Sequence, residues 1–94
     1  MKGHLYQITV AHVEDPKGNP VHKAPLSFAV KNHDDLFDIV AKVKAKHLFE
    51  EQEAEAFAIG LKLFREVMLR HRGSEVFAKL NPHFSEFMKE FKQR

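Results

Sequence analysis

The chain has 94 residues, 44% hydrophobic and 30% charged, a balance typical of a globular protein and unlike that of a disordered or fibrous one. It contains no cysteine, which excludes disulfides, thiolate nucleophiles and cysteine-ligated metal sites. The net charge of +2 is mild, and no apolar stretch approaches a signal peptide or the roughly 20 residues of a membrane span. We expect one domain over residues 1–94, cytoplasmic and without a membrane segment.

The N-terminal segment predicts a β-strand followed by a turn. Residues 4–13 alternate in polarity, with Tyr6, Ile8 and Val10 on one face, which is typical of a half-buried strand. Asp15-Pro16-Lys17-Gly18 places proline second and glycine fourth, where each favours a chain reversal. The pattern predicts a β-hairpin.

The returning strand alternates through Leu26, Phe28 and Val30. Pro20 and Pro25 lack a backbone donor, which indicates an edge strand. No third strand is evident, so the outer side of the first strand should also be an unpaired edge.

A first helix is predicted after the hairpin, with Asn32 as its cap and with Asp34 and Asp35 in its first turn, near the positive end of the helix dipole. Apolar residues then recur at helical spacing, and the last turn is basic. The apolar positions are Leu36, Ile39, Val40 and Val43, and the basic ones are Lys42, Lys44 and Lys46.

Residues 50–70 predict a second, central helix with half of its circumference apolar. Gly60 in mid-helix predicts a close approach by another element. Ser74 can cap a short turn, and Asn81-Pro82 predicts a new helix start. The fold class is therefore α+β, a two-stranded hairpin followed by three helices in the order β-β-α-α-α, with the third helix open to a split at Asn81-Pro82.

The hairpin opening, the segment Asn32-His33-Asp34-Asp35-Leu36-Phe37 and residues 56–69, AFAIGLKLFREVML, resemble a small bacterial family known only as a domain of unknown function. The resemblance covers nearly the whole chain. It implies a bacterial, stand-alone, cytoplasmic protein and carries over no activity, cofactor or catalytic residue.

The residues themselves predict no catalytic, cofactor or metal site. The seven histidines form no HxH or HxxxH pair, so we interpret them as surface residues. His33-Asp34 resembles a dipeptide of metal-dependent phosphohydrolases, but the chain is too short to supply the other ligands. The hydroxyl residues lie in no nucleophile motif, and the four glycines form no phosphate loop. A small enzyme or a metal-binding protein remains an open, weaker alternative.

Nucleic-acid binding is the main alternative function, because Lys42, Lys44 and Lys46 could form a basic patch. The charge layout disfavours it. Both long helices begin with acidic residues and end with basic ones, so their fields should largely cancel if the helices are antiparallel.

The unpaired edge of the first strand favours protein interaction instead. We predict a symmetric homodimer in which the first strands of two copies pair antiparallel into a four-stranded sheet. The interface residues would be Leu5, Gln7, Thr9, Ala11 and Val13. The open alternative is a monomer whose edges are blunted by Pro25, Gln7 and Thr9. The function hypothesis is a non-catalytic protein-interaction or regulatory module whose partner protein the sequence does not identify.

Overall fold

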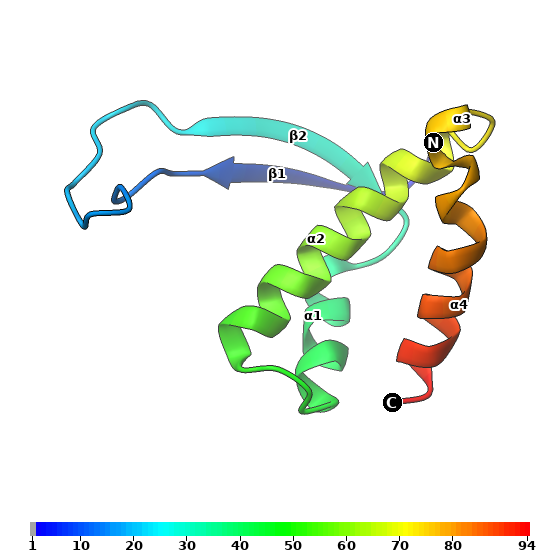
Figure 1. The fold of residues 1–94 in the computed structure, drawn as a ribbon. Coiled ribbons are helices and arrows are strands. Elements are labelled where there is room, and N and C mark those ends of the chain that lie inside the picture. The colour runs from blue at the N-terminus through cyan, green and yellow to red at the C-terminus, as the bar shows by residue number, and fades with distance from the viewer. Residues whose placement is uncertain (1) are drawn as a thin grey trace. The chain divides into compact units, whose positions relative to one another are not determined.

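The computed structural model describes residues 2–94, which form two compact units, one ending at His33 and the other beginning at Asp34. Two antiparallel strands are followed by helices, so the fold is α+β, as predicted (Figure 1). The predicted division of the third helix is also present. The elements are β1 (His4–Val10), β2 (Leu26–Asn32), α1 (Leu36–Ala45), α2 (Glu51–Arg70), α3 (Glu75–Ala78) and α4 (Leu80–Lys92).

The hairpin unit pairs β1 with β2 along their whole length, from His4 opposite Asn32 to Val10 opposite Leu26. The predicted first strand, residues 4–13, therefore ends three residues early in the structure. Within residues 2–94 no further strand joins this sheet, so each strand is an edge, as the sequence predicts.

The predicted chain reversal at Asp15–Gly18 is confirmed. The Asp15 carboxylate accepts hydrogen bonds from the N–H groups of Lys17 and Asn19, both at 2.9 Å. The Gly18 N–H donates to the Asp15 carbonyl at 3.0 Å. Gly18 has φ +87°, a left-handed conformation that glycine adopts without a steric penalty.

The turn should respond to acid. Backbone donation from Asn19 is the main reason that the pKa of Asp15 lies below its ordinary value of 3.8. Because the folded-state pKa is lowered, the ionised carboxylate stabilises the turn fully above pH 3.8, and this contribution is lost as pH falls through the lowered pKa. We expect an NMR titration to show the Lys17 and Asn19 amides shifting together at that lower pH, and Asp15→Asn to abolish the shift.

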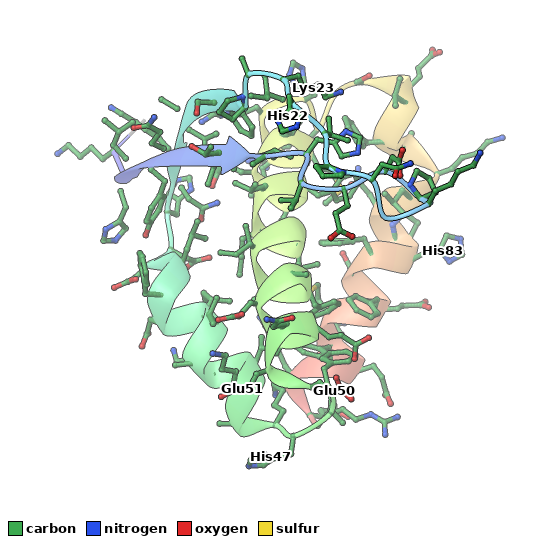
Figure 2. The ribbon with its side chains drawn as sticks, turned by 90° about the vertical axis from the view of Figure 1, so that its left-hand side faces the viewer. His22, Lys23, His47, Glu50, Glu51 and His83 are labelled. Carbon is green, nitrogen blue, oxygen red and sulfur yellow. The ribbon has the colours of Figure 1, made fainter. Side chains whose placement is uncertain are left out.

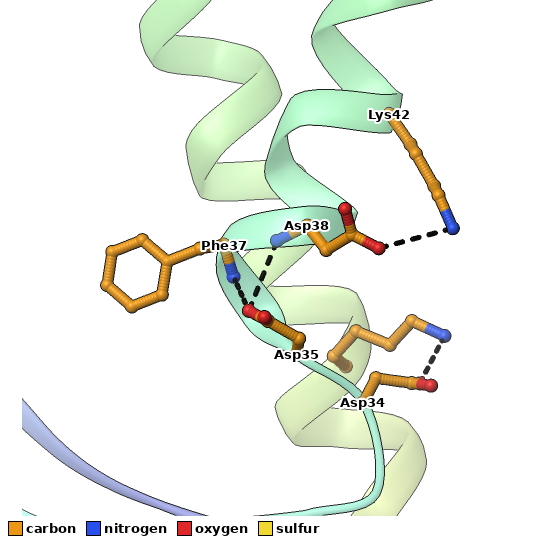
Figure 3. A network of polar contacts seen from close by, with 6 residues as sticks. Asp34, Asp35, Phe37, Asp38 and Lys42 are labelled. Carbon is orange, nitrogen blue, oxygen red and sulfur yellow. Dashed lines mark hydrogen bonds and ion pairs between the residues drawn. The ribbon is translucent and has the colours of Figure 1, made fainter.

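The helix cap at the start of α1 differs from the prediction. Asn32 does not cap the helix, because it is the last residue of β2 and is paired with His4. Asp35 is the cap, and its carboxylate accepts hydrogen bonds from the N–H groups of Phe37 at 3.0 Å and Asp38 at 3.3 Å (Figure 3). The extension of β2 to Asn32 moves the helix start downstream to the next side chain able to satisfy these donors.

Removing this cap should cost stability. We expect Asp35→Ala to lower the free energy of unfolding by about 1 kcal/mol, because two donors of the first turn lose their acceptor. The control is Asp38→Ala, which removes an exposed ion pair with Lys42 (3.4 Å) and a first-turn carboxylate but leaves the cap in place, and should cost less than Asp35→Ala. Urea denaturation of the two variants measures the difference, and equal losses would contradict the cap assignment.

The helical unit is centred on the contact between α1 and α2. Ala54 and Ala58 are fully buried, and Val43 of α1 packs with them. The helices are antiparallel, because Lys44 pairs with Glu55 at 3.1 Å while Asp34, just before α1, pairs with Lys62 further along α2 at 2.9 Å.

The predicted close approach at Gly60 is wrong. Gly60 is exposed, and within the described part of the chain no other element approaches to within 4 Å of the position that a Cβ atom would take there. The close approach occurs at Ala54 and Ala58 instead, because α1 packs against the side of α2 that carries these two alanines.

The C-terminal helices meet at Lys79. Ser74 caps α3 as predicted, with its hydroxyl accepting a hydrogen bond from the Val76 N–H at 3.3 Å. Asn81 is not a cap: α4 begins one residue earlier, at Leu80, so that Asn81 and Pro82 lie in its first turn. Proline is tolerated there because the first-turn N–H groups have no partner within the helix.

Candidate protein-interaction surface

The outer edge of β1 lacks the features that normally prevent strand edges from pairing. Proteins usually protect an edge with charged side chains, especially lysine, or with proline. Residues 4–13 contain no Asp, Glu, Lys, Arg or Pro. The segment of β2 by contrast carries Lys31 within the strand and Pro25 directly before it. The β1 edge is therefore the better candidate for pairing with another chain.

Three of the five predicted interface residues lie in β1. Leu5, Gln7 and Thr9 are exposed and share one face of the hairpin. Thr9 Oγ1 lies 2.8 Å from the hydroxyl of Ser27 directly opposite, which ties the two strands together on this face. Ala11 and Val13 lie beyond the end of β1, and the Val13 carbonyl accepts a hydrogen bond from the Val21 N–H at 3.0 Å.

The other face of the hairpin carries an exposed apolar patch that the sequence analysis missed. Val10, Leu26 and Phe28, here called the turn-end patch, expose 55%, 64% and 40% of their surface. Val10 lies directly opposite Leu26. Phe28 lies opposite Ile8 in the neighbouring pair on the same face. Towards the other end of this face, Tyr6 and Val30 are half-buried. The sequence does carry a signal for this patch: on this face of both strands, every position from Tyr6 and Val30 up to the turn end is apolar.

The three lysines predicted as a basic patch each contact a different group. Lys42 pairs with Asp38 at 3.4 Å and Lys44 with Glu55 at 3.1 Å. The ammonium of Lys46 lies 5.1 Å from the centre of the Phe91 ring, a cation–π distance. Two of the three ammonium groups therefore lie beside a carboxylate, which weakens their attraction for a phosphate backbone.

The histidines and carboxylates are spread over several elements of the described chain. In the part of the chain that the structure describes, no three His, Cys, Asp or Glu residues lie close enough to hold a metal ion. His22, His47 and His83 extend outward from a loop, a helix junction and α4 (Figure 2). None of the helices described is long and apolar enough to cross a membrane.

An aromatic cluster joins α2 to α4 and leaves a hollow beside it. The Phe57 ring lies 5.1 Å from that of Phe49 and 5.0 Å from that of Phe91, measured between ring centres. The adjacent hollow has a volume of about 410 Å³ and is rimmed by the ion pair of Arg94 with Glu90. It is an open, largely apolar surface without a convergent set of polar groups, which does not point to a catalytic pocket.

Comparison with known proteins identifies the family. A family model described as a domain of unknown function with a solved structure, DUF3861, matches residues 4–93. The chain belongs to the DUF3861 family. This confirms the predicted resemblance to a family of unknown function.

A bacterial protein of known structure is similar to this chain. The crystal structure of a protein of unknown function from Pectobacterium atrosepticum is 38% identical in sequence and has a TM-score of 0.83. The match covers 99% of this chain and 100% of that one. No curated protein matches the chain. Membership of the DUF3861 family therefore supports the fold and assigns no reaction.

Proposed function

We propose that this protein is a non-catalytic protein-interaction module that acts as a symmetric homodimer, with the outer edges of two β1 strands paired antiparallel. The observation that carries the proposal is the composition of that edge: seven paired residues with no charge and no proline, on a strand with only one neighbour. Pairing with a copy would satisfy the backbone groups of the free edge.

The strand is compatible with its own copy. Full overlap of His4–Val10 with a second copy places the two-fold axis at Gln7, because Gln7 is the middle residue of β1. Tyr6 then lies opposite Ile8 of the second copy, so aromatic and β-branched side chains meet on one face. No like charges oppose each other in this register. By comparison, pairing through the β2 edge would add Lys31 to the contact.

Dimerisation would also stabilise the hairpin by enlarging its sheet. A hairpin of two strands is marginal in water, whereas three or more strands with an apolar face form a stable sheet. Joining two hairpins would give four strands and a continuous composite surface. We place the module in the cytoplasm, as the family resemblance implies, and regard this composite surface as the region that a further partner protein would contact.

The test of the proposal is the mass of the protein in solution. One chain has a mass of 10.9 kDa, so light scattering after size exclusion should give about twice that value at micromolar concentration. Raised salt should leave the dimer intact, because the paired edge carries no charge. A mass of one chain at every concentration would refute the proposal. Binding of the protein to added nucleic acid, with an affinity that falls steeply as the salt concentration rises, would instead favour nucleic-acid binding as the function.

A further inference from the structure

The turn-end patch is an apolar surface that the hairpin itself does not cover. The patch lies on one face of the sheet, and its members belong to two neighbouring cross-strand pairs: Val10, Leu26 and Phe28. Apolar surface of this kind on a β-sheet is normally covered by another element or by another chain. A contact that covers this patch is available within the proposed β1–β1 dimer, and it rests on that dimer.

The dimer register places the patch near the end of β2 of the other copy. With Gln7 on the axis, Val10 of one copy lies opposite His4 of the second, and His4 is itself paired with Asn32. One row of side chains then crosses all four strands. It contains Asn32 and His4 of one copy, followed by Val10 and Leu26 of the other copy. Strands in a sheet are about 4.8 Å apart, so Asn32 lies about 10 Å from Val10 of the other copy.

Phe37 lies within reach of this patch along the chain. It follows Asn32 by five positions, a length of chain that spans at most about 17 Å. Its side chain is 80% exposed, more than that of any other large apolar residue in the described part of the chain. Leu36 beside it is 2% exposed and so cannot serve as the contact.

The first turn of α1 holds Phe37 in place. The N–H of Phe37 donates to the capping carboxylate of Asp35, and the ring extends away from the polar contacts of this turn (Figure 3). The capped turn fixes the backbone of Phe37, so only its side-chain torsions would be ordered on binding. An exposed phenylalanine on an ordered backbone suits an intermolecular contact.

We infer that Phe37 of each copy packs on the turn-end patch of the other copy, so that the dimer is closed by two symmetric aromatic contacts outside the paired strands. An aromatic side chain buries about 150–250 Å² when covered. Two such rings and the two patches they cover add substantially to a short strand pairing, and a stable interface needs about 1,200 Å² or more.

Cysteine cross-linking between different chains tests this contact directly. The protein has no cysteine, so single-cysteine variants carry one defined thiol each. Phe37→Cys and Leu26→Cys chains, mixed and allowed to exchange, should form a disulfide between copies. A disulfide requires Cα atoms within about 7 Å, so this cross-link reports the proposed contact. The matched control replaces Phe37→Cys with Val76→Cys, a residue of α3 that is 79% exposed, and should give no more cross-link than random collision.

A second variant separates this inference from the proposed dimer. Phe37→Ser should raise the dissociation constant of the dimer at least about tenfold while the far-ultraviolet circular dichroism stays unchanged, whereas Val76→Ser should leave the constant as it is. If the unaltered protein is a monomer, both the dimer and this contact are wrong. If it is a dimer but Phe37→Ser has no effect and the cross-link does not exceed its control, only the Phe37 contact is wrong.

Discussion

Replacing Gln7 with lysine should convert the proposed dimer into monomers, replacing it with glutamate should do the same, and mixing the two variants should restore dimers. Gln7 is the middle residue of β1, so an antiparallel pair of identical strands with full overlap places it opposite itself. A single substitution therefore introduces two like charges side by side. Like charges directly opposed across an interface cost several kcal/mol, whereas a Lys–Glu pair is attractive.

The measurement is light scattering over a dilution series, with an expected rise in the dissociation constant of about tenfold to a hundredfold for each variant alone. Gln7 is exposed, so neither variant should disturb the hairpin. Gln52→Lys is the matched control, because Gln52 is also an exposed glutamine but lies on α2. Dimers that are unaffected by both changes at Gln7 would rule out a two-fold axis at this residue.

Phe57→Ala should be strongly destabilising in the helical unit, with a loss of about 2 kcal/mol in the free energy of unfolding, because the ring is half-buried at the centre of the aromatic cluster. The Phe57 ring contacts the rings of Phe49, Phe87 and Phe91, with centres 5.1, 6.3 and 5.0 Å away. Within the described residues α4 has no fully buried side chain, so aromatic contacts such as these hold it against α2. Removing the central ring should release α4 first.

Urea denaturation measures the loss, and amide hydrogen exchange locates it, with α4 expected to lose protection before α1 and α2. Val76→Ala is the control, because that side chain is 79% exposed and lies outside the proposed interface, so its removal should change the free energy of unfolding by no more than about 0.5 kcal/mol. A loss for Phe57→Ala as small as that of the control would show that the aromatic cluster does not anchor α4.

The sequence by itself determined the order of elements, the turn at Asp15–Gly18 and the extent of α2. These features depend on local chemistry: the two-residue period of strands, the helical spacing of apolar residues, and the backbone preferences of proline and glycine. The cap of α1 was placed wrongly at Asn32 because a cap depends on where the preceding strand ends, and the pairing of Asn32 with His4 fixes that end. Asn81 was misassigned for a similar reason, since the junction at Lys79 lets α4 begin at Leu80.

Only the tertiary structure decided which small residues allow close packing, which lysines are engaged and which apolar residues stay exposed. Ala54 and Ala58 are buried and Gly60 is not, although all three lie on the same helix. Lys44 forms an ion pair with Glu55, which lies eleven residues away along the chain. The turn-end patch has the same alternating pattern as the half-buried part of its face. Burial and ion pairing depend on what another element places opposite a residue, and a local pattern of polarity does not contain that information.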